Sequence, residues 1–257
     1  MKTKFIFFAL VLVSVLMPAK AQQKLTVDLS HASNYMAHGR TLSNDLGCFQ
    51  PGLYYGLKSG TTIMGWVSAA WDRTTSYNDE WNIIIDQNND LFKDKKEWNI
   101  NLHGYANYWY LPNYANNVQS FYQGMKYNAG IHFPLVLSKS MGLKMTTGYD
   151  YYYYHEVGRD TKDINAAGIH EFLVKFNKSF KSFATEYKAV ISNNRGAIDA
   201  GINPGWAYFS QHLSVLYNHK YLSLRPSVNY QRTLDSTIHP DKNLVYFSLG
   251  LLKTFKL

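Results

Sequence analysis

The sequence predicts an all-β protein, a transmembrane antiparallel up-and-down β-barrel that most simply has twelve strands. Three observations lead to this prediction: an N-terminal segment typical of secretory signal peptides, a two-residue alternation of apolar and polar side chains, and an excess of tyrosine. Aromatic residues make up 16% of the chain, and 21 residues are tyrosines. A protein that stands in a bilayer places such rings in belts at the two interfaces, where the ring is apolar and its polar atom is wet.

The first residues predict export. Two lysines precede the apolar run 5–17, which is followed by a proline and the small-residue site Ala19-Lys20-Ala21. This is the pattern of a secretory signal peptide, and the run is too short to cross a bilayer as a helix. We therefore expect residues 1–21 to be removed and residues 22–257 to form one outer-membrane β-barrel. The first mature residue, Gln22, is not a cysteine, which argues against a lipid anchor.

Composition argues against several classes of protein. Removing residues 1–21 takes away three lysines and no acid, so the formal net charge falls from +8 to +5. The remaining charges are dispersed, without a basic helix or a recognised binding motif, so we expect no nucleic-acid partner. Cys48 is the only cysteine, which excludes an intrachain disulfide scaffold. We expect no cofactor.

The alternation of side chains predicts strands with two unlike faces. In the segment 221–231 the even positions Leu222, Leu224 and Val228 are apolar, whereas the odd positions are mostly polar. The segments 49–57, 98–108 and 183–191 follow the same period. The last segment alternates Val245, Phe247 and further apolar residues, as the terminal strands of outer-membrane barrels do. We expect this strand to be recognised by the barrel-assembly machinery.

The strands can be counted and checked by parity, because a barrel with both termini in the periplasm needs an even number. Ten strands follow if two of the segments are loops. The twelve expected strands are 24–35, 48–58, 61–73, 80–87, 96–111, 119–133, 139–154, 164–177, 181–193, 205–217, 220–233 and 242–256.

The segment GYDYYYYHE, residues 148–156, places five tyrosines among six residues. On an outward-running strand, Tyr149, Tyr151 and Tyr153 would face lipid at the outer interface, and Tyr152 and Tyr154 would face the mouth of the lumen. Both faces tolerate a phenol there. A soluble sandwich would have to supply a partner for each buried hydroxyl, so this alternative fits less well.

The segment 33–72 resembles the first hairpin of the TorF-type family of porins. It carries a Ser-x-Tyr opening, a Pro-led second strand and the sequence Gly65-Trp66, where the family shows a Gly-x-Trp strand. The segment 104–117, GYANYWYLPNYANN, with 120–127, SFYQGMKY, is similar to the family's tyrosine-rich strand. The chain departs from the family pattern at His38, Leu111 and Gln123. The resemblance implies a barrel in the outer membrane of a Gram-negative bacterium more directly than it implies transport.

Alternation also assigns the residues that we expect to line the lumen. Both signs of charge occur among them, so we expect a narrow, weakly selective channel for small solutes or ions; the same charges could instead pair and close the interior. The expected lining residues are Asp28, Asn34, Asp86, Asn99, Asn101, His103, Lys126, Asn128, His132, Lys144, Asp150, Glu171, Glu186, Lys188, His212, Arg225, Asn229 and Gln231.

Two alternatives remain open at this point. The first is a lipid-acting barrel enzyme of the phospholipase or deacylase type, with Ser33 and His31 as nucleophile and base, or the pair His155-Glu156 at the other rim; neither matches a hydrolase motif, so we expect no catalytic residues. The second is a closed structural barrel. We expect no metal site, because His155-Glu156 and His170-Glu171 are adjacent and diverge on a strand. The expected partners are outer-membrane lipid and lipopolysaccharide.

Overall fold

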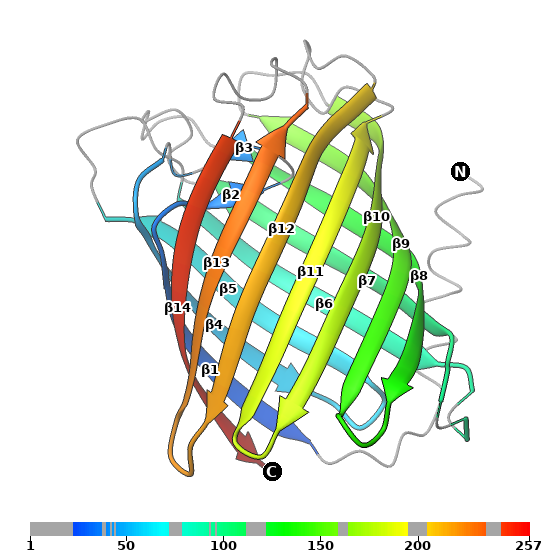
Figure 1. Cartoon of the computed structure of the whole chain (residues 1–257). Helices are drawn as coiled ribbons and strands as arrows, with labels where there is room; N and C mark the ends of the chain where they lie inside the picture. Colours follow the sequence, from blue (N-terminus) through cyan, green and yellow to red (C-terminus); the bar gives the residue numbers. More distant parts are fainter. Residues whose placement is uncertain are drawn as a thin grey trace.

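The chain folds as one closed antiparallel β-barrel (Figure 1). The computed structural model describes residues 23–37, 40–41, 43, 45–71, 79–92, 94–95, 97–111, 122–158, 164–194, 205–234 and 243–257. The proposed signal peptide lies outside these residues. Within them, no helix is long and apolar enough to cross a membrane.

Twelve strands form the wall, in agreement with the predicted number, and each pairs with its neighbours in the barrel. Their bounds are β1 Lys24–Ala32, β4 Cys48–Gly56, β5 Thr61–Ala70, β6 Glu80–Asp90, β7 Asn101–Leu111, β8 Tyr122–Ser138, β9 Leu143–Gly158, β10 Ile164–Phe180, β11 Phe183–Asn194, β12 Gly205–Asn218, β13 Ser223–Thr233 and β14 Asn243–Lys256.

The barrel closes where its first strand meets its last. β1 pairs along its whole length with β14 on one side and with β4 on the other. The pairing continues past the end of β1, because Ser33 N donates to Phe247 O at 2.8 Å and Phe247 N donates to Ser33 Oγ at 2.9 Å. Consequently neither strand presents a free edge at this seam. We call the end with the C-terminus the turn end and the opposite end the far end.

The two faces of the wall are as the alternation predicts. Large apolar side chains are exposed on the outside, and polar side chains are buried on the inside. The outward set includes Leu53, Ile83, Phe133, Phe172, Val245 and Phe247. The inward set includes Asp28, Asn128, Asp150, Glu171, Asn229 and Gln231.

Most strand bounds differ from the prediction by a few residues, and two of these differences have clear local reasons. β7 begins at Asn101 rather than at 96, because Asn99 Oδ1 accepts hydrogen bonds from the backbone N–H groups of Phe92 and Ile100 and shapes a turn there. β8 continues past Pro134, whose carbonyl accepts a hydrogen bond from Asn99 N outside β7. A proline has no N–H to donate, and Pro134 takes part in this pairing through its carbonyl.

The segment after β1 turns into the barrel instead of extending the strand to residue 35. It carries the short strands β2, Met36–Ala37, and β3, Arg40–Thr41, which pair with each other near the far end (Figure 1). Asn34 and Ser43 are only 6% and 1% exposed. Their mutual hydrogen bond of 3.0 Å, together with that from Tyr35 N to Ser43 Oγ, holds the segment in place.

The tyrosine-rich strand β9 also has the predicted faces. On the outer face, Tyr149 OH and His170 Nδ1 share a hydrogen bond of 2.7 Å, and the ring of Tyr151 also lies against His170. On the inner face, Tyr152 makes an edge contact with Tyr105. The pairing of β9 with β10 shifts between Ala166 and Ile169, where the sequence pattern is ambiguous, and Gly168 there has a φ of +61°. The side chain of Tyr154 lies outside the described residues.

The turn between β4 and β5 generates a first prediction. Gly60 has a φ of +87°, and a Cβ at this position would lie 2.8 Å from Asn88 O. Gly60→Ala should therefore lower the free energy of unfolding of the detergent-folded barrel by about 1–3 kcal/mol. Gly65→Ala is the matched control on the next strand, because a Cβ at Gly65 meets nothing within 4 Å. Urea unfolding measures both, and equal midpoints would contradict the assigned turn geometry.

Candidate functional site in the barrel interior

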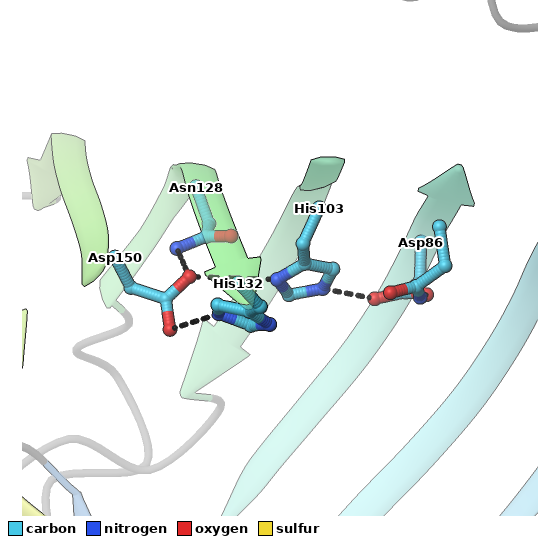
Figure 2. Close-up of polar contacts among 6 residues, drawn as sticks. Asp86, His103, Asn128, His132 and Asp150 are labelled. Carbon is cyan, nitrogen blue, oxygen red and sulfur yellow. Dashed lines mark hydrogen bonds and ion pairs between the residues drawn. The ribbon is translucent and has the colours of Figure 1, made fainter. Parts of the chain in front are cut away.

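The interior holds a cluster of histidines and carboxylates on the wall formed by β6 to β9 (Figure 2). Its members, which we call the His–Asp cluster, are Asp86, His103, Asn128, His132 and Asp150. Asp86 Oδ2 lies 2.8 Å from His103 Nε2, and Asp150 Oδ2 lies 3.1 Å from His132 Nε2. The other nitrogen of His103, Nδ1, faces Asp150 Oδ1 at 3.5 Å. Asn128 Nδ2 donates to Asp150 Oδ1 at 3.2 Å.

Strand register and glycine explain why these side chains meet. His103 on β7, Gly130 on β8 and Asp150 on β9 are register partners in one row across the wall. A Cβ at Gly130 would lie 2.0 Å from Asp150 Oδ1, so the missing side chain lets two residues from strands two apart approach over β8. Gly148 on β9 leaves room for the His132 ring in a similar way, because a Cβ at Gly148 would lie 2.3 Å from that ring.

A second polar pair crosses the closure seam. Arg225 Nη2 on β13 donates to Asp28 Oδ2 on β1 at 2.8 Å, and Ser30 also donates to Asp28. β14 lies between these strands. Its residue opposite Arg225 and Ser30 is Gly250, where a Cβ would come within 2.9 Å of Ser30 Oγ. The Asp28 side chain is 4% exposed and that of Arg225 is 42% exposed. A buried carboxylate is thus paired with a cation that reaches toward the lumen.

A cavity of about 320 Å³ lies on the opposite wall, over β11 to β14. His212 Nδ1 lies 2.6 Å from Asn229 Oδ1, and Glu186 accepts a hydrogen bond from Asn177 and lies 3.9 Å from Lys175 Nζ. Lys188 has no ion-pair partner among the residues that the structure describes. The lining residues are Glu186, Lys188, Val190, Ser210, Gln211, His212, Asn229 and Tyr246.

Near the far end, the segment after β1 contributes a phenol to the interior. Tyr35 OH donates to Glu80 Oε2 at 2.9 Å, and its ring makes an edge contact with Trp66. Asn82 donates to the same carboxylate at 2.8 Å and accepts from Asn107 at 2.7 Å. Burial, followed by the charge of Glu80, raises the pKa of Tyr35 well above its usual value, so the phenol stays neutral and donates. This network narrows the interior at that level.

The remaining predicted lining residues are placed differently from one another. Asn99 belongs to the turn before β7, and Asn101 donates to Asp90 at 3.1 Å in an exposed position near that turn. Lys144 is exposed near the start of β9. Lys126 lies over the Tyr105 ring at 5.5 Å, and Glu171 accepts a hydrogen bond from Tyr208. These positions are spread along the barrel rather than gathered at one site.

Sequence reasoning missed the inward aromatic residues. Tyr105, Tyr208, Tyr246 and Trp109 occupy inward positions of their strands, and outside the tyrosine-rich segment the prediction considered polar residues alone. Their parity relative to His103, Asp150 and Asn229 was available in the sequence. Nothing in the sequence indicated that His103, His132 and Asp150 lie together, because their proximity depends on the register between strands.

Of the pairs considered for catalysis, Ser33 and His31 are not arranged as a nucleophile and its base. Ser33 Oγ accepts from the backbone of Phe247, and the His31 ring lies 5.8 Å from the Trp71 ring; within the described part of the chain no hydrogen bond joins Ser33 to His31. His170 faces outward toward Tyr149, whereas Glu171 faces inward. The side chains of 155 and 156 lie outside the described residues.

Comparison with solved structures identifies the same fold in outer-membrane porins. The NanC porin is 13% identical, with a TM-score of 0.53 over 90% of this chain and 100% of that chain. The KdgM porin is 9% identical, with a TM-score of 0.51 over 90% of this chain and 99% of that chain. At these identities the likeness shows the fold alone. No protein-family model matches the sequence, and no curated protein matches it.

The pair across the seam generates a second prediction. Arg225→Met should lower the free energy of unfolding by about 1–3 kcal/mol, because it leaves the buried Asp28 carboxylate without its charged donor. The double variant Asp28→Asn with Arg225→Met should recover part of this loss, since the stranded charge is gone. Urea unfolding of the detergent-folded barrels measures the coupling. Strictly additive losses would show that the two residues do not stabilise each other.

Proposed function

We propose that this chain is an outer-membrane β-barrel that acts as a narrow, weakly selective channel for small solutes or ions. The observation that carries the proposal is the inverted distribution of side chains. Among the described residues, the outside presents large apolar side chains and the buried interior is mainly polar and charged. A soluble protein of this size would have to do the reverse.

The outer surface supports a position in a bilayer. Exposed aromatic residues gather near both ends of the strands, and aliphatic residues lie between them, which is the arrangement of the girdles in outer-membrane barrels. The far-end group comprises Trp71, Trp81, Tyr108 and Trp206. The turn-end group comprises Phe92, Trp98, Phe180, Phe183, Tyr221 and Phe255.

The interior supports a narrow path with little preference for charge. A barrel of twelve strands is intermediate in width. Side chains fill the interior of an eight-stranded barrel, and porins of 16 to 18 strands leave an open channel. Interior charges of opposite sign lie close together, as in Arg225–Asp28, Lys175–Glu186 and the His–Asp cluster. Paired charges leave little net field to select ions. Tyr35 and its partners narrow the path near the far end.

The proposal extends to export and assembly. Residues 1–21 would be cleaved during export, and the exposed apolar face of β14, with Val245, Phe247 and Leu249, supports recognition by the barrel-assembly machinery. The outer wall would contact lipid and, on the outer leaflet of a Gram-negative bacterium, lipopolysaccharide. Membership of the TorF-type family stays a prediction that rests on the segments 33–72 and 104–127.

The two rival functions make different demands on the molecule. A lipid hydrolase would need a base beside a nucleophile on the outer wall, and Ser33 is instead engaged by the backbone of the seam. A closed structural barrel would need the Tyr35 network to be complete across the interior, and the cavity beside Lys188 argues against a fully packed lumen. Ion conduction distinguishes the channel from both rivals, and release of fatty acids distinguishes the two rivals from each other.

The membrane location generates a third prediction, which compares two adjacent residues of β12. Leu213 is 46% exposed on the outside, and His212 lines the interior cavity. Leu213→Arg should hinder insertion into lipid vesicles, at a cost of about 2–4 kcal/mol near mid-bilayer. His212→Arg should fold with at most about 1 kcal/mol lost with its hydrogen bond. Heat-modifiable gel mobility reports folding; equal insertion of both variants would place the wall outside a bilayer.

The channel itself generates a fourth prediction, measured by reconstitution in planar bilayers. The wild-type protein should give discrete conductance steps with a small reversal potential under a salt gradient. Lys188→Glu should shift that reversal potential toward cation preference, because the residue lines the cavity without an ion-pair partner among the described residues. Lys178→Glu is the control, since its ammonium lies over the outward Phe180 ring near the turn end.

Three outcomes would count against the channel. Silence of the correctly inserted wild-type protein would favour a closed structural barrel. A shift of equal size in both lysine variants would show that Lys188 does not line the path. Release of fatty acids from phospholipid or lipid A vesicles by the silent protein would favour the enzyme.

A further inference from the structure

We propose that His103, His132 and Asp150 form a binding site for a divalent transition-metal ion on the inner wall of the barrel. Asp86 and Asn128 hold the ligands in position (Figure 2). The site is distinct from the cavity over β11 to β14, and the proposal does not depend on conduction. It differs from the expectation, drawn from adjacent His-Glu pairs, that the chain has no metal site.

The separations of the ligand atoms suit one ion. One nitrogen from each histidine and one oxygen from Asp150 all lie within 4.8 Å of one another. Each histidine lies nearest a different oxygen of this carboxylate: His132 Nε2 is 3.1 Å from Oδ2, and His103 Nδ1 is 3.5 Å from Oδ1. Ligand atoms bound at about 2.1 Å to one tetrahedral centre lie roughly 3.4 Å apart, so side-chain adjustments of about 1 Å bring all three onto one centre.

The orientation of His103 is that of a metal ligand held by a carboxylate. Its Nε2 lies 2.8 Å from Asp86 Oδ2, as in the carboxylate–histidine–metal arrangement, where the nitrogen away from the metal donates to an acid. With the proton on Nε2, the lone pair of Nδ1 points at the Asp150 carboxylate. Nδ1 is buried and makes no hydrogen bond among the described residues. Two acceptors that face each other call for a cation between them.

Asp150 is held for the same task. Its side chain is 5% exposed, and Asn128 donates to the oxygen that faces His103. Asn128 itself is 1% exposed, and its Oδ1 has no hydrogen-bond partner among the described residues. The Asn128 amide thus bonds through its NH₂ group to Asp150. This fits a role in positioning the carboxylate, as residues behind the ligands do in metal sites.

The backbone leaves the space that this geometry needs. Two inward positions that adjoin the ligands are glycines: a Cβ at Gly130 would overlap the Asp150 carboxylate, and one at Gly148 would overlap the His132 ring. Because the two glycines lie on neighbouring strands, the ligands lean over bare backbone rather than over side chains. This makes a cradle in which the three ligand atoms converge.

The donor set indicates the class of metal. Two imidazoles and a carboxylate suit Zn²⁺ and its first-row neighbours, whereas Ca²⁺ and Mg²⁺ prefer oxygen ligands alone. Three protein ligands leave a position for water, as in open zinc sites. The side chains of His103 and His132 are 17% and 18% exposed, so this position would face the lumen and exchange with it. The two nearby carboxylates balance a divalent charge.

The rival explanation is a purely structural network, in which a second proton on His103 replaces the metal. Zinc binding distinguishes the metal site from the structural network.

The test uses the barrel refolded in detergent, without a polyhistidine tag, and dialysed against a chelator that is then removed. Titration with Zn²⁺ should give one saturable equivalent, and Co²⁺ should give a visible ligand-field absorption that Zn²⁺ displaces. A barrel that folds, as judged by heat-modifiable mobility, and binds no equivalent would overturn the proposal.

Variants test whether the bound equivalent of Zn²⁺ occupies this site. His132→Gln and Asp150→Asn should each abolish it, and Asp86→Asn should weaken it by about 10–100-fold, the usual effect of losing an outer partner. His212→Gln is the matched control, because His212 is also an inward histidine, but it pairs with the amide of Asn229 rather than with an acid. An equivalent that survives His132→Gln, or that is lost in His212→Gln, would also overturn the assignment.

A folding control keeps the result decisive if a substitution prevents refolding. His103→Gln and His132→Gln are compared first for heat-modifiable mobility without metal. The Co²⁺ absorption of any folded variant is then recorded, since a structural network would leave no such spectrum in the wild type. Retention of the wild-type spectrum in either folded variant would exclude that histidine as a ligand, and with it the proposed site.

Discussion

The ladder between β1 and β14 is the constraint on which the rest of the structure depends. Each residue from Lys24 to Ala32 pairs with both β14 and β4, and Ser33 continues the seam by exchanging hydrogen bonds with Phe247. Without this closure, two strands would present unpaired backbone groups, which hydrocarbon cannot solvate. With it, every strand is satisfied laterally, and the side chains are free to carry an apolar outer face and a polar inner face.

Closure also brings side chains from strands that are not neighbours into contact. Arg225 reaches Asp28 past Gly250, and His103 reaches Asp150 past Gly130. Gly130 lies in the same row as both of its partners, whereas Gly250 lies in the row of Arg225 and Ser30, next to the row in which Asp28 pairs with Leu252. In each case the intervening strand lacks a side chain at the position that the longer partner crosses. The interior is therefore organised by glycine positions as much as by its charges. Across the seam, this arrangement gives the buried Asp28 carboxylate a charged donor, which a buried charge requires.

Period-two alternation was sufficient to predict the twelve strands and their faces, because the face of each residue depends only on its parity within a strand. It could not predict that the chain turns inward after Ala32, since the hydrogen bonds between Asn34, Ser43 and Asp45 join residues that alternation treats as strand or loop. Nor could it predict the His–Asp cluster. His103 and Asp150 lie 47 positions apart in the sequence, and only the register of three strands places them in one row.

The interior is uneven around its circumference, and this bears on how the proposed channel would work. Near the far end, Tyr35 reaches across to Glu80 and Trp66, so aromatic and amide side chains occupy the β5 to β7 side. The cavity lies instead over β11 to β14, where Lys188 and His212 face the lumen. A solute that crossed the barrel would follow the second wall. The His–Asp cluster, on β6 to β9, stands beside that path rather than in it, so an ion held there would alter the field along the lumen without having to occupy the route itself.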